Sequence, residues 1–310
     1  MKLKTMPRVL FIGDINVDVM MGGMASLPLV DREVTCQTYD VVMGASTVLC
    51  ACAYRSLGGE AAIIGLVGHD EYGEFMLRGL GEFGIRTDLV RRTSRVRTGV
   101  TVNLIYQSTR TQVTYSGSIA EFEGPDLEAA VFRGFDHVHC GGVYLQTKFA
   151  PRLTAVLELA RRLGLTTSLD PQWDSTERWE YMDEWMPLVS WLFVNQDEAV
   201  SISKAGSVAQ ACRWLAQRTR CPLVKTGQDG ALIWTGREAP AVPGWPVQVV
   251  DTTGAGDSFD AGFLYATLQK QMPLAEAARF ANAVAARSCM FVGGVNARSS
   301  YEDVLRFMRA

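Results

Sequence analysis

The feature that most constrains the fold is a repeated alternation of short apolar, β-branched runs with longer amphipathic stretches. Continuous apolar runs of this kind are typical of strands buried on both faces, as in parallel sheets. The intervening stretches place apolar residues at helical spacing, for example at 151–163, 208–217 and 274–287. Strand followed by helix, several times over, predicts an α/β fold with a doubly wound, mostly parallel sheet and helices on both faces. The expected strands are residues 8–13, 61–65, 137–140, 166–170, 191–195 and 222–225.

Two segments, residues 33–42 and 98–115, depart from this alternation because polar and apolar side chains follow one another at period two. Such a pattern predicts half-exposed antiparallel strands. No helix pattern separates them, so we expect a small antiparallel sheet beside the main one, contributed by roughly residues 18–43 and 98–117. A sheet in that place is suited to act as a lid over a site, or as the contact of a homodimer.

The composition of the chain limits the classes of protein to which it can belong and the kinds of partner that it can bind. The 310 residues are 48% hydrophobic and contain no repeat, low-complexity stretch or Pro/Ser-rich linker, so we expect one domain over residues 1–310. A net charge of -3 without a basic block argues against nucleic acid or an anionic membrane and for a small-molecule partner. No apolar run is long enough to span a membrane, and residues 1–9 lack the apolar stretch of a signal peptide, which predicts a cytoplasmic location.

The cysteines and histidines give little indication of a metal site or a catalytic site. The seven cysteines are odd in number and lie mostly in apolar runs, which indicates small core residues rather than a zinc or thiol site. His137 and His139 share one predicted strand, and we expect one to face the core and the other a pocket or another layer.

The densest motif is Asp251-Thr-Thr-Gly-Ala-Gly-Asp-Ser-Phe-Asp-Ala-Gly262, in which a glycine turn opens a helix. Backbone N–H groups at a helix start have no partner within the helix, and Gly254 and Gly256 let an anion approach them. Asp257 follows in the first turn, where its carboxylate would face that anion. This is a poor choice for capping alone and a good one for taking a proton from an attacking hydroxyl. The alternative is an ordinary N-terminal Asp stabilised by the helix dipole.

Several other motif classes are absent or incomplete. The same stretch lacks the third glycine of the dinucleotide fingerprint, because Phe259 stands there, so an oxidoreductase is only weakly supported. The Walker phosphate loop, the H-E-x-x-H helix and the G-x-S-x-G elbow do not occur. A kinase with this sequence must therefore be of another type.

Asp251 to Gly262 resembles the second signature of the ribokinase family, also called the phosphofructokinase-B family of sugar and nucleoside kinases. Four further stretches resemble family motifs in family order, namely residues 13–18, 65–73, 195–198 and 226–230. The resemblance implies a ribokinase-like fold and an ATP-dependent carbohydrate kinase that phosphorylates a primary hydroxyl of a sugar or sugar-like compound. An alternative of the same fold is a nucleoside or pseudouridine kinase, and one of another class is a non-catalytic sugar- or nucleotide-binding protein.

The resemblance also implies roles for single residues. Asp257 would be the catalytic base, with the backbone of Gly254, Ala255 and Gly256 as the anion hole. On the acceptor side, the substrate would be bound by Asn16, Asp18 and Gly44. On the nucleotide side, ATP would be bound by Asn195, Lys225, Gly227, Gly230 and Asn282, the last beside adenine. Glu198 would hold Mg²⁺ through water, and backbone carbonyls around Asp251 and Thr253 would hold K⁺.

Two positions depart from the family pattern. Leu49 stands where the first signature has Asn, so a hydrogen bond to a substrate hydroxyl is lost and ribose is disfavoured. Gln172 lies where many members carry Asn and then Arg, which disfavours an acidic sugar. Leu49, together with Tyr106 and Tyr115 on the expected lid, favours the nucleoside alternative. Trp173 is expected to be a packing aromatic rather than a stacking platform.

Overall fold

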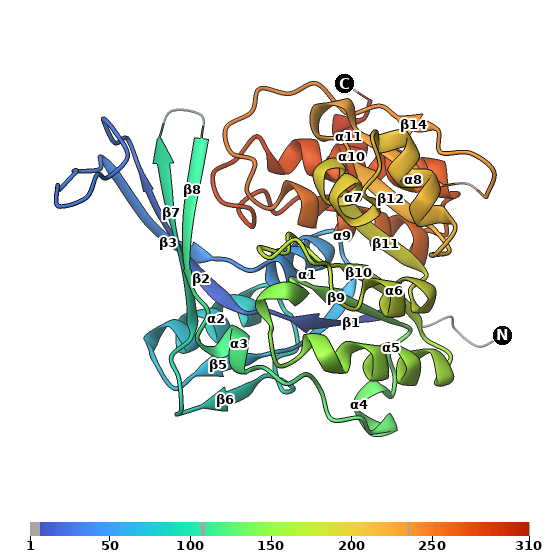
Figure 1. The fold of residues 1–310 in the computed structure, drawn as a ribbon, viewed down its shortest axis with the longest axis horizontal. Coiled ribbons are helices and arrows are strands. Elements are labelled where there is room, and N and C mark those ends of the chain that lie inside the picture. The colour runs from blue at the N-terminus through green and yellow to red at the C-terminus, as the bar shows by residue number, and fades with distance from the viewer. Residues whose placement is uncertain (1–6, 107–108, 235, 310) are drawn as a thin grey trace.

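The computed structural model describes residues 7–106, 109–234 and 236–309. Within them, eight strands form one main sheet, in which β1, β4 and β9 to β12 run parallel and β13 pairs antiparallel with both β12 and β14 (Figure 1). This confirms the doubly wound, mostly parallel sheet. In spatial order the strands are β14 (Ala241–Val242), β13 (Ala231–Ile233), β12 (Pro222–Lys225), β11 (Trp191–Asn195), β10 (Thr166–Asp170), β9 (His137–Gly141), β1 (Arg8–Gly13) and β4 (Glu60–Ile64).

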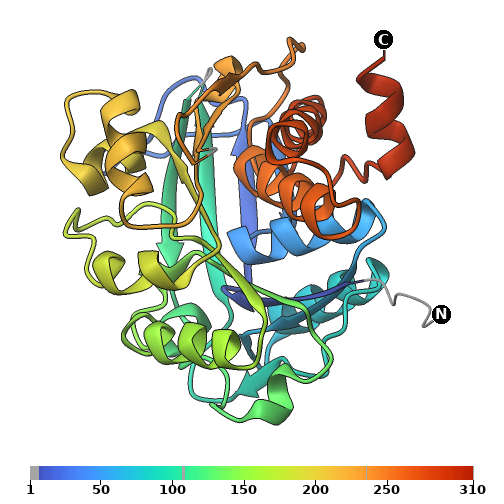
Figure 2. The same cartoon turned by 90° about the vertical axis from the view of Figure 1, so that its right-hand side faces the viewer.

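Helices cover both faces of this sheet, as Figure 2 shows. Successive strand residues point to opposite faces, so β1 sends Val9 and Phe11 into one core and Leu10 and Ile12 into the other. The first core is covered by α1 (Ser46–Ser56), α2 (Glu71–Glu82), α9 (Ala255–Leu268), α10 (Leu274–Ser288) and α11 (Tyr301–Phe307). The second is covered by α4 (Ala129–Phe132), α5 (Leu153–Arg162), α6 (Met182–Trp185), α7 (Gln196–Ser203) and α8 (Val208–Ala216).

A second sheet of four strands, here called the lid, stands out from the body on the side of α2 (Figure 1). Its outer pairs are antiparallel, as expected, whereas β2 and β7 in its middle run parallel. The first lid strand begins at Asn16, directly after β1, and the second at Thr38 rather than near residue 33. In spatial order the strands are β3 (Thr38–Met43), β2 (Asn16–Gly22), β7 (Gly99–Tyr106) and β8 (Thr109–Tyr115).

The lid is fastened at its base by the motif at residues 65–73. Asp70 caps α2 by accepting from Gly73 N at 2.8 Å, and it also accepts from Thr98 N and Thr98 Oγ1, each at 2.7 Å. A Cβ on Gly68 would lie 2.7 Å from Thr98 N, so only glycine allows this approach. The motif therefore ties the chain that enters β7 to the core. The neighbouring elements are β5 (Leu66–Gly68), β6 (Arg91–Thr93) and α3 (Ser118–Glu121).

The two histidines of β9 do not face opposite sides, so that expectation was wrong. Both are buried, and both bind Ser168 Oγ, through His137 Nε2 at 2.7 Å and His139 Nδ1 at 2.8 Å. The reason is the strand period, because residues two apart share a face. The cysteines are unpaired within the described residues, and five of the seven are buried, as expected. No helix in the described part of the chain is long and apolar enough to cross a membrane.

Candidate active site

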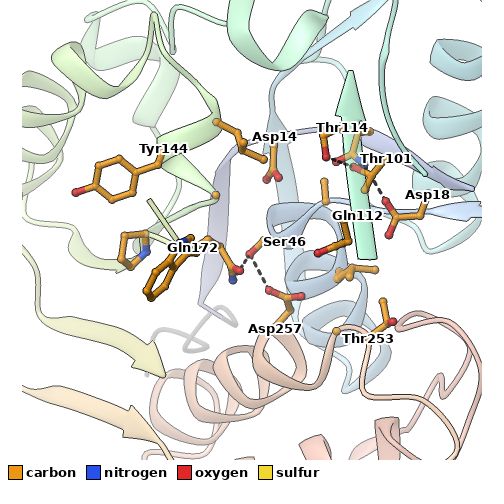
Figure 3. A pocket seen from close by; sticks show the side chains of 18 residues that line it. Asp14, Asp18, Ser46, Thr101, Gln112, Thr114, Tyr144, Gln172, Thr253 and Asp257 are labelled. Carbon is orange, nitrogen blue, oxygen red and sulfur yellow. Dashed lines mark hydrogen bonds between the residues drawn. The ribbon is translucent and has the colours of Figure 1, made fainter. Parts of the chain in front are cut away.

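A cavity of about 320 Å³ lies where the lid meets the carboxyl ends of β1, β9 and β10 and the start of α9 (Figure 3). Open α/β sheets bind ligands at this edge of the sheet. The cavity gathers residues that lie far apart in the sequence, from Asp14 to Asp257. Of the predicted site residues, Asn16, Asp18, Thr253, Gly254 and Asp257 line it.

Asp257 is buried in the first turn of α9, with 7% of its surface exposed. Ser46 Oγ donates to its Oδ1 at 2.7 Å. Burial, followed by the negative charge of Asp170, raises the pKa of Asp257 to about 7, while the Ser46 hydrogen bond and Lys225 act in the opposite direction. A carboxylate that titrates near neutrality is well matched to general-base catalysis.

The start of α9 is a glycine turn, as expected, and its binding of an anion stays a prediction. Gly254 is the N-cap and has a left-handed backbone with φ 72°. A Cβ at this position would lie 2.9 Å from Gly294 Cα and 3.2 Å from Leu49 Cδ1, so Leu49 packs against the turn. The N–H of Ala255 already donates to the Thr252 carbonyl at 3.2 Å. One of the three predicted donors is therefore engaged within the turn.

The lid wall of the cavity brings the predicted substrate residues together. Asn16 Nδ2 donates to Asp18 Oδ1 at 3.0 Å and to Thr101 Oγ1 at 3.3 Å. Gly44 lies directly against this pair, because a Cβ there would come within 2.2 Å of Asp18 Oδ1. The hydroxyls of Thr101 and Thr114 lie 3.0 Å apart, which extends the polar wall along the lid.

Sequence reasoning missed Asp14, which also lines the cavity. It is buried and accepts hydrogen bonds from Thr47 N at 3.1 Å and Thr47 Oγ1 at 2.7 Å. Burial raises its pKa to about 6, against the effect of these bonds. The sequence did point to this residue, because Asp14 belongs to the same motif, residues 13–18, as Asn16. Ser46 also lines the cavity and was missed, and no local pattern marks it as a site residue. Gln172, which the sequence singled out only as a departure from the family pattern, lines the cavity too.

The wall opposite the lid is aromatic, although not through the residues expected. Tyr144, Leu145 and Trp173 line the cavity there. Trp173 also packs edge to face against Trp179, with ring centroids 5.5 Å apart, which agrees with the prediction of a packing aromatic. Neither Tyr106 nor Tyr115 is among the described residues that line it. Tyr115 instead borders a different cavity, because Thr114 takes the inner face of β8 and its neighbour must point outward.

Lys225 lies in a buried ion cluster beneath the start of α9. Its Nζ lies 2.7 Å from Asp170 Oδ2 and 3.2 Å from Asp260 Oδ1. A Cβ on Gly256 would lie 3.2 Å from the same Nζ. Burial alone lowers the pKa of Lys225, but the surrounding carboxylates raise it above its ordinary value, so the side chain stays charged. The structure thus places a fixed cation behind the predicted anion hole.

Asn195 and Glu198 form the capping box of α7. Asn195 Oδ1 accepts from Asp197 N at 2.9 Å and Glu198 N at 2.8 Å, and Glu198 Oε2 accepts from Asn195 N at 2.8 Å. Glu198 is 3% exposed, and burial together with the charge of Asp170 raises its pKa to about 7. Both residues therefore have a structural role, and their part in binding nucleotide and Mg²⁺ stays a prediction.

Of the remaining nucleotide-side residues, Gly227 and Gly230 lie in the turn between β12 and β13, and Asn282 lies in α10. Gly227 and Gly230 have φ of 63° and 101°, and a Cβ on Gly230 would lie 2.1 Å from Val242 O. Asn282 Nδ2 donates to the carbonyls of Val242 at 2.9 Å and Pro243 at 3.0 Å. Its amide N–H groups thus hold the backbone after β14 in this structure. Contact of these three residues with a nucleotide stays a prediction.

Asp251 ties two loops together. Its Oδ1 accepts from Thr253 N at 2.9 Å and Thr253 Oγ1 at 2.7 Å, and its Oδ2 accepts from Gly293 N at 2.9 Å. The turn before α9 therefore lies against the loop after α10. The side chain of Asp251 is used in this contact, which leaves backbone carbonyls as the predicted cation ligands.

Comparison with known proteins shows the family to which the chain belongs. Residues 6–299 match the model of the pfkB family carbohydrate kinases. The ATP-dependent ribose-1-phosphate kinase of Halopiger xanaduensis is 30% identical over 301 residues, covering 95% of each chain. The aminoimidazole riboside kinase of Salmonella typhimurium is 30% identical over 313 residues, covering 95% of this chain and 93% of that protein.

A solved structure shows the shared fold. It is a double mutant of the fructokinase of Vibrio cholerae O395 with fructose, ADP and a potassium ion bound, and it superposes with a TM-score of 0.82 at 21% identity. The match covers 97% of this chain and 98% of the fructokinase chain. The ribokinase-like fold predicted from the sequence is confirmed.

Proposed function

Because this chain belongs to the pfkB family of carbohydrate kinases, we propose that it transfers the γ-phosphoryl group of ATP to a primary hydroxyl of a sugar or sugar-like compound. The observation that carries the proposal is the place of Asp257. Its carboxylate is buried at the start of α9, at the edge of a cavity with polar side chains. A base there can reach a bound hydroxyl and a phosphate group at the helix start together.

In the proposed reaction, Asn16 and Asp18 bind neighbouring hydroxyls of the acceptor. Asp257 takes the proton of the attacking hydroxyl. At the same time the oxygen of that hydroxyl bonds to the γ-phosphorus, and the bond between the γ-phosphorus and the leaving ADP oxygen breaks. The N–H groups and dipole at the start of α9 stabilise the negative charge on the transferring group. Lys225, whose Nζ would lie 3.2 Å from a Cβ on Gly256, adds positive potential at the same point.

The metal ions predicted from the sequence are part of this proposal. No group of three or more His, Cys, Asp or Glu side chains in the described chain is arranged to hold a metal, so Mg²⁺ would be held mainly by phosphate oxygens and water. Asn195 and Glu198 offer oxygen ligands of the kind Mg²⁺ prefers, and the ion neutralises phosphate charge when bound. K⁺ would bind carbonyls around Asp251 and Thr253, beside the loop that Asp251 fastens.

The cavity favours an uncharged acceptor. Asp14, Asp18 and Asp257 line it, and no Lys or Arg occurs among its described lining residues. A phosphate group on the acceptor would lie close to three carboxylates, which is unfavourable in a partly buried site. We therefore propose a neutral polyol as acceptor, although the relative from Halopiger xanaduensis is a kinase of ribose 1-phosphate.

One observation favours a nucleoside or pseudouridine as the second candidate acceptor. Tyr144 and Trp173 line the wall opposite Asn16 and Asp18, and Trp173 is 43% exposed. Aromatic faces there could stack against a flat ring while the lid wall binds the sugar. The related aminoimidazole riboside kinase also takes its name from a sugar joined to a flat ring.

The test is Mg²⁺-dependent ADP production from ATP across neutral pentoses, hexoses and ketoses, nucleosides including pseudouridine, and sugar phosphates. We expect turnover with a neutral acceptor and a loss of at least about a hundredfold in Asp257→Asn. Equal activity of the variant and the parent would overturn the role of Asp257. Binding of ATP and acceptor without ADP formation would favour the non-catalytic binding protein. Turnover only with sugar phosphates would refute the neutral acceptor.

We also propose that residues 1–310 act as one domain that pairs through the lid with a second copy. The outward face of the lid is apolar, which is unusual for an exposed sheet. Light scattering that gives the 34.0 kDa mass of a monomer at micromolar concentration would contradict the pairing. The cytoplasmic location stays a prediction. The exposed or half-exposed apolar residues of this face are Met21, Tyr39, Val41, Val100, Val102, Leu104, Val113 and Tyr115.

A further inference from the structure

We propose that Ser46 and Gln172 are positioning residues for Asp257, and that through Asp170 they connect this carboxylate to the buried charge of Lys225. The inference rests on the proposed function, because it takes Asp257 to be the base. The family pattern described above gives Ser46 no role, and it connects position 172 with the choice of substrate rather than with the base. Both line the acceptor cavity, where Figure 3 shows Gln172 and Asp257 turned toward Ser46 from opposite sides.

The hydrogen bonds around Ser46 have one consistent direction. Ser46 Oγ and Asp257 Oδ1 are 2.7 Å apart, and Gln172 Nε2 and Ser46 Oγ are 3.1 Å apart. An ionised carboxylate only accepts, so the single hydroxyl hydrogen of Ser46 points to Asp257. The second contact must then be donated by the Gln172 amide. The chain of bonds therefore needs a hydroxyl at position 46 and an N–H donor at position 172.

The backbone at position 172 continues the chain toward Lys225. Gln172 N donates to Asp170 Oδ1 at 3.1 Å, and Asp170 Oδ2 accepts from Lys225 Nζ at 2.7 Å. Gln172 has a left-handed backbone with φ 59°, which is unfavourable for a residue other than glycine. Such strain persists where surrounding contacts enforce it, and it gathers at functional sites. Here the enforced backbone aims the Gln172 side chain at Ser46.

This arrangement has a chemical consequence for the base. Since Oδ1 of Asp257 is occupied by Ser46, Oδ2 is the oxygen left to take the acceptor proton. The Ser46 hydrogen bond also favours the ionised carboxylate. It acts with Lys225 of β12 against burial and against the negative charges of Asp170 and Asp14. Asp260 lies in the same cluster, and burial raises its pKa well above its ordinary value. Of the titratable groups on α1, Cys50 faces the same cluster.

The experiment measures kcat and kcat/KM as functions of pH with the member of the acceptor panel that the parent enzyme turns over fastest. In Ser46→Ala we expect the acidic limb of the profile to move to higher pH and kcat at pH 7 to fall about tenfold, since one hydrogen bond to a charged group is lost. Ser46→Thr keeps the hydroxyl and should restore the parent profile. Ser56→Ala is the matched control, because this hydroxyl lies on the same helix and donates to the Cys52 carbonyl.

Gln172→Asn tests the second link. Asparagine accepts the left-handed backbone but is one methylene too short to reach Ser46. We expect a shift of the acidic limb in the same direction and smaller than that of Ser46→Ala. The double variant Ser46→Ala/Gln172→Asn should lose no more than Ser46→Ala alone, because Gln172 acts through Ser46. An additive loss would overturn this order.

The outcomes separate the two proposals. An acidic limb in Ser46→Ala that matches the parent would refute the positioning role, even if kcat falls, provided that Asp257→Asn is inactive. If Asp257→Asn keeps parental activity, it is the base assignment that fails. Should Ser46→Ala not fold, as judged by circular dichroism, Gln172→Asn carries the test by itself, and an unshifted limb there would refute the inference.

Discussion

Replacing Lys225 by methionine tests the buried ion cluster most directly. Methionine fills nearly the same volume, so the cost is electrostatic rather than that of a cavity. The side chains of Asp170 and Asp260 are each 1% exposed, and that of Lys225 is 13% exposed. Removing one partner of such a buried pair costs about 3–5 kcal/mol, because the other charge stays buried and uncompensated. We expect Lys225→Met to lower the free energy of unfolding by this amount at pH 8.

The protonation of the cluster gives this loss a pH dependence. Burial alone raises the pKa of Asp170, but Lys225 brings it below its ordinary value, whereas burial raises the pKa of Asp260 well above its own. Asp170 is thus the charged partner of Lys225. Without Lys225, the folded state holds a proton on Asp170 that the unfolded chain, with a pKa near about 4, does not bind. The loss should therefore be smaller at pH 5.5 than at pH 8.

The assay is urea unfolding followed by tryptophan fluorescence at both pH values. Lys225→Met/Asp170→Asn serves as the matched control, because it removes both members of the ion pair and should recover most of the stability. A loss below about 1 kcal/mol at pH 8, where buried pairs cost several times more, would refute the reasoning. So would a loss of equal size at the two pH values.

Two further predictions concern stability. Ala45, the N-cap of α1, has φ 74° and ψ 131°, which is a strained backbone for alanine. Ala45→Gly should stabilise the protein by about 1 kcal/mol, because the relief of this strain exceeds the extra conformational entropy that glycine loses on folding. A lower urea midpoint for the variant would contradict this. Burial lowers the pKa of His139 to about 4, while the unfolded side chain titrates near about 6.5. The unfolded state alone therefore binds this proton as pH falls below 6.5, and about 3 kcal/mol should be lost by pH 4. His139→Phe, beside Phe11 and Phe193, should flatten that part of the stability–pH curve, and an unchanged slope would count against the assignment.

Much of the fold could be predicted because its signals are local. Each of the six strands expected in the main sheet lies within one residue of the observed one, since a buried strand needs a continuous apolar run. The period located three lid strands, β3, β7 and β8, but not β2. Nor did it give the parallel pairing of β2 with β7, because alternation says which face is buried and not which neighbour is bonded. For the two histidines of β9 the sequence did contain the information, because residues two apart on a strand share a face, but the prediction did not use it.

The residues of the site likewise fall into those that local sequence patterns predict and those that only the fold brings together. By itself the sequence determined Asp257, the glycine turn before it, and Asn16 with Asp18 after the first strand, because a helix start and a strand end dictate which groups face a ligand. Only the tertiary structure decided that Ser46 and Gln172, 126 residues apart, meet at Asp257. It also decided that Lys225 lies between Asp170 and Asp260 beneath the start of α9. These contacts join different elements across the carboxyl edge of the sheet, and no local spacing records them, because long-range contacts are set by how the layers pack.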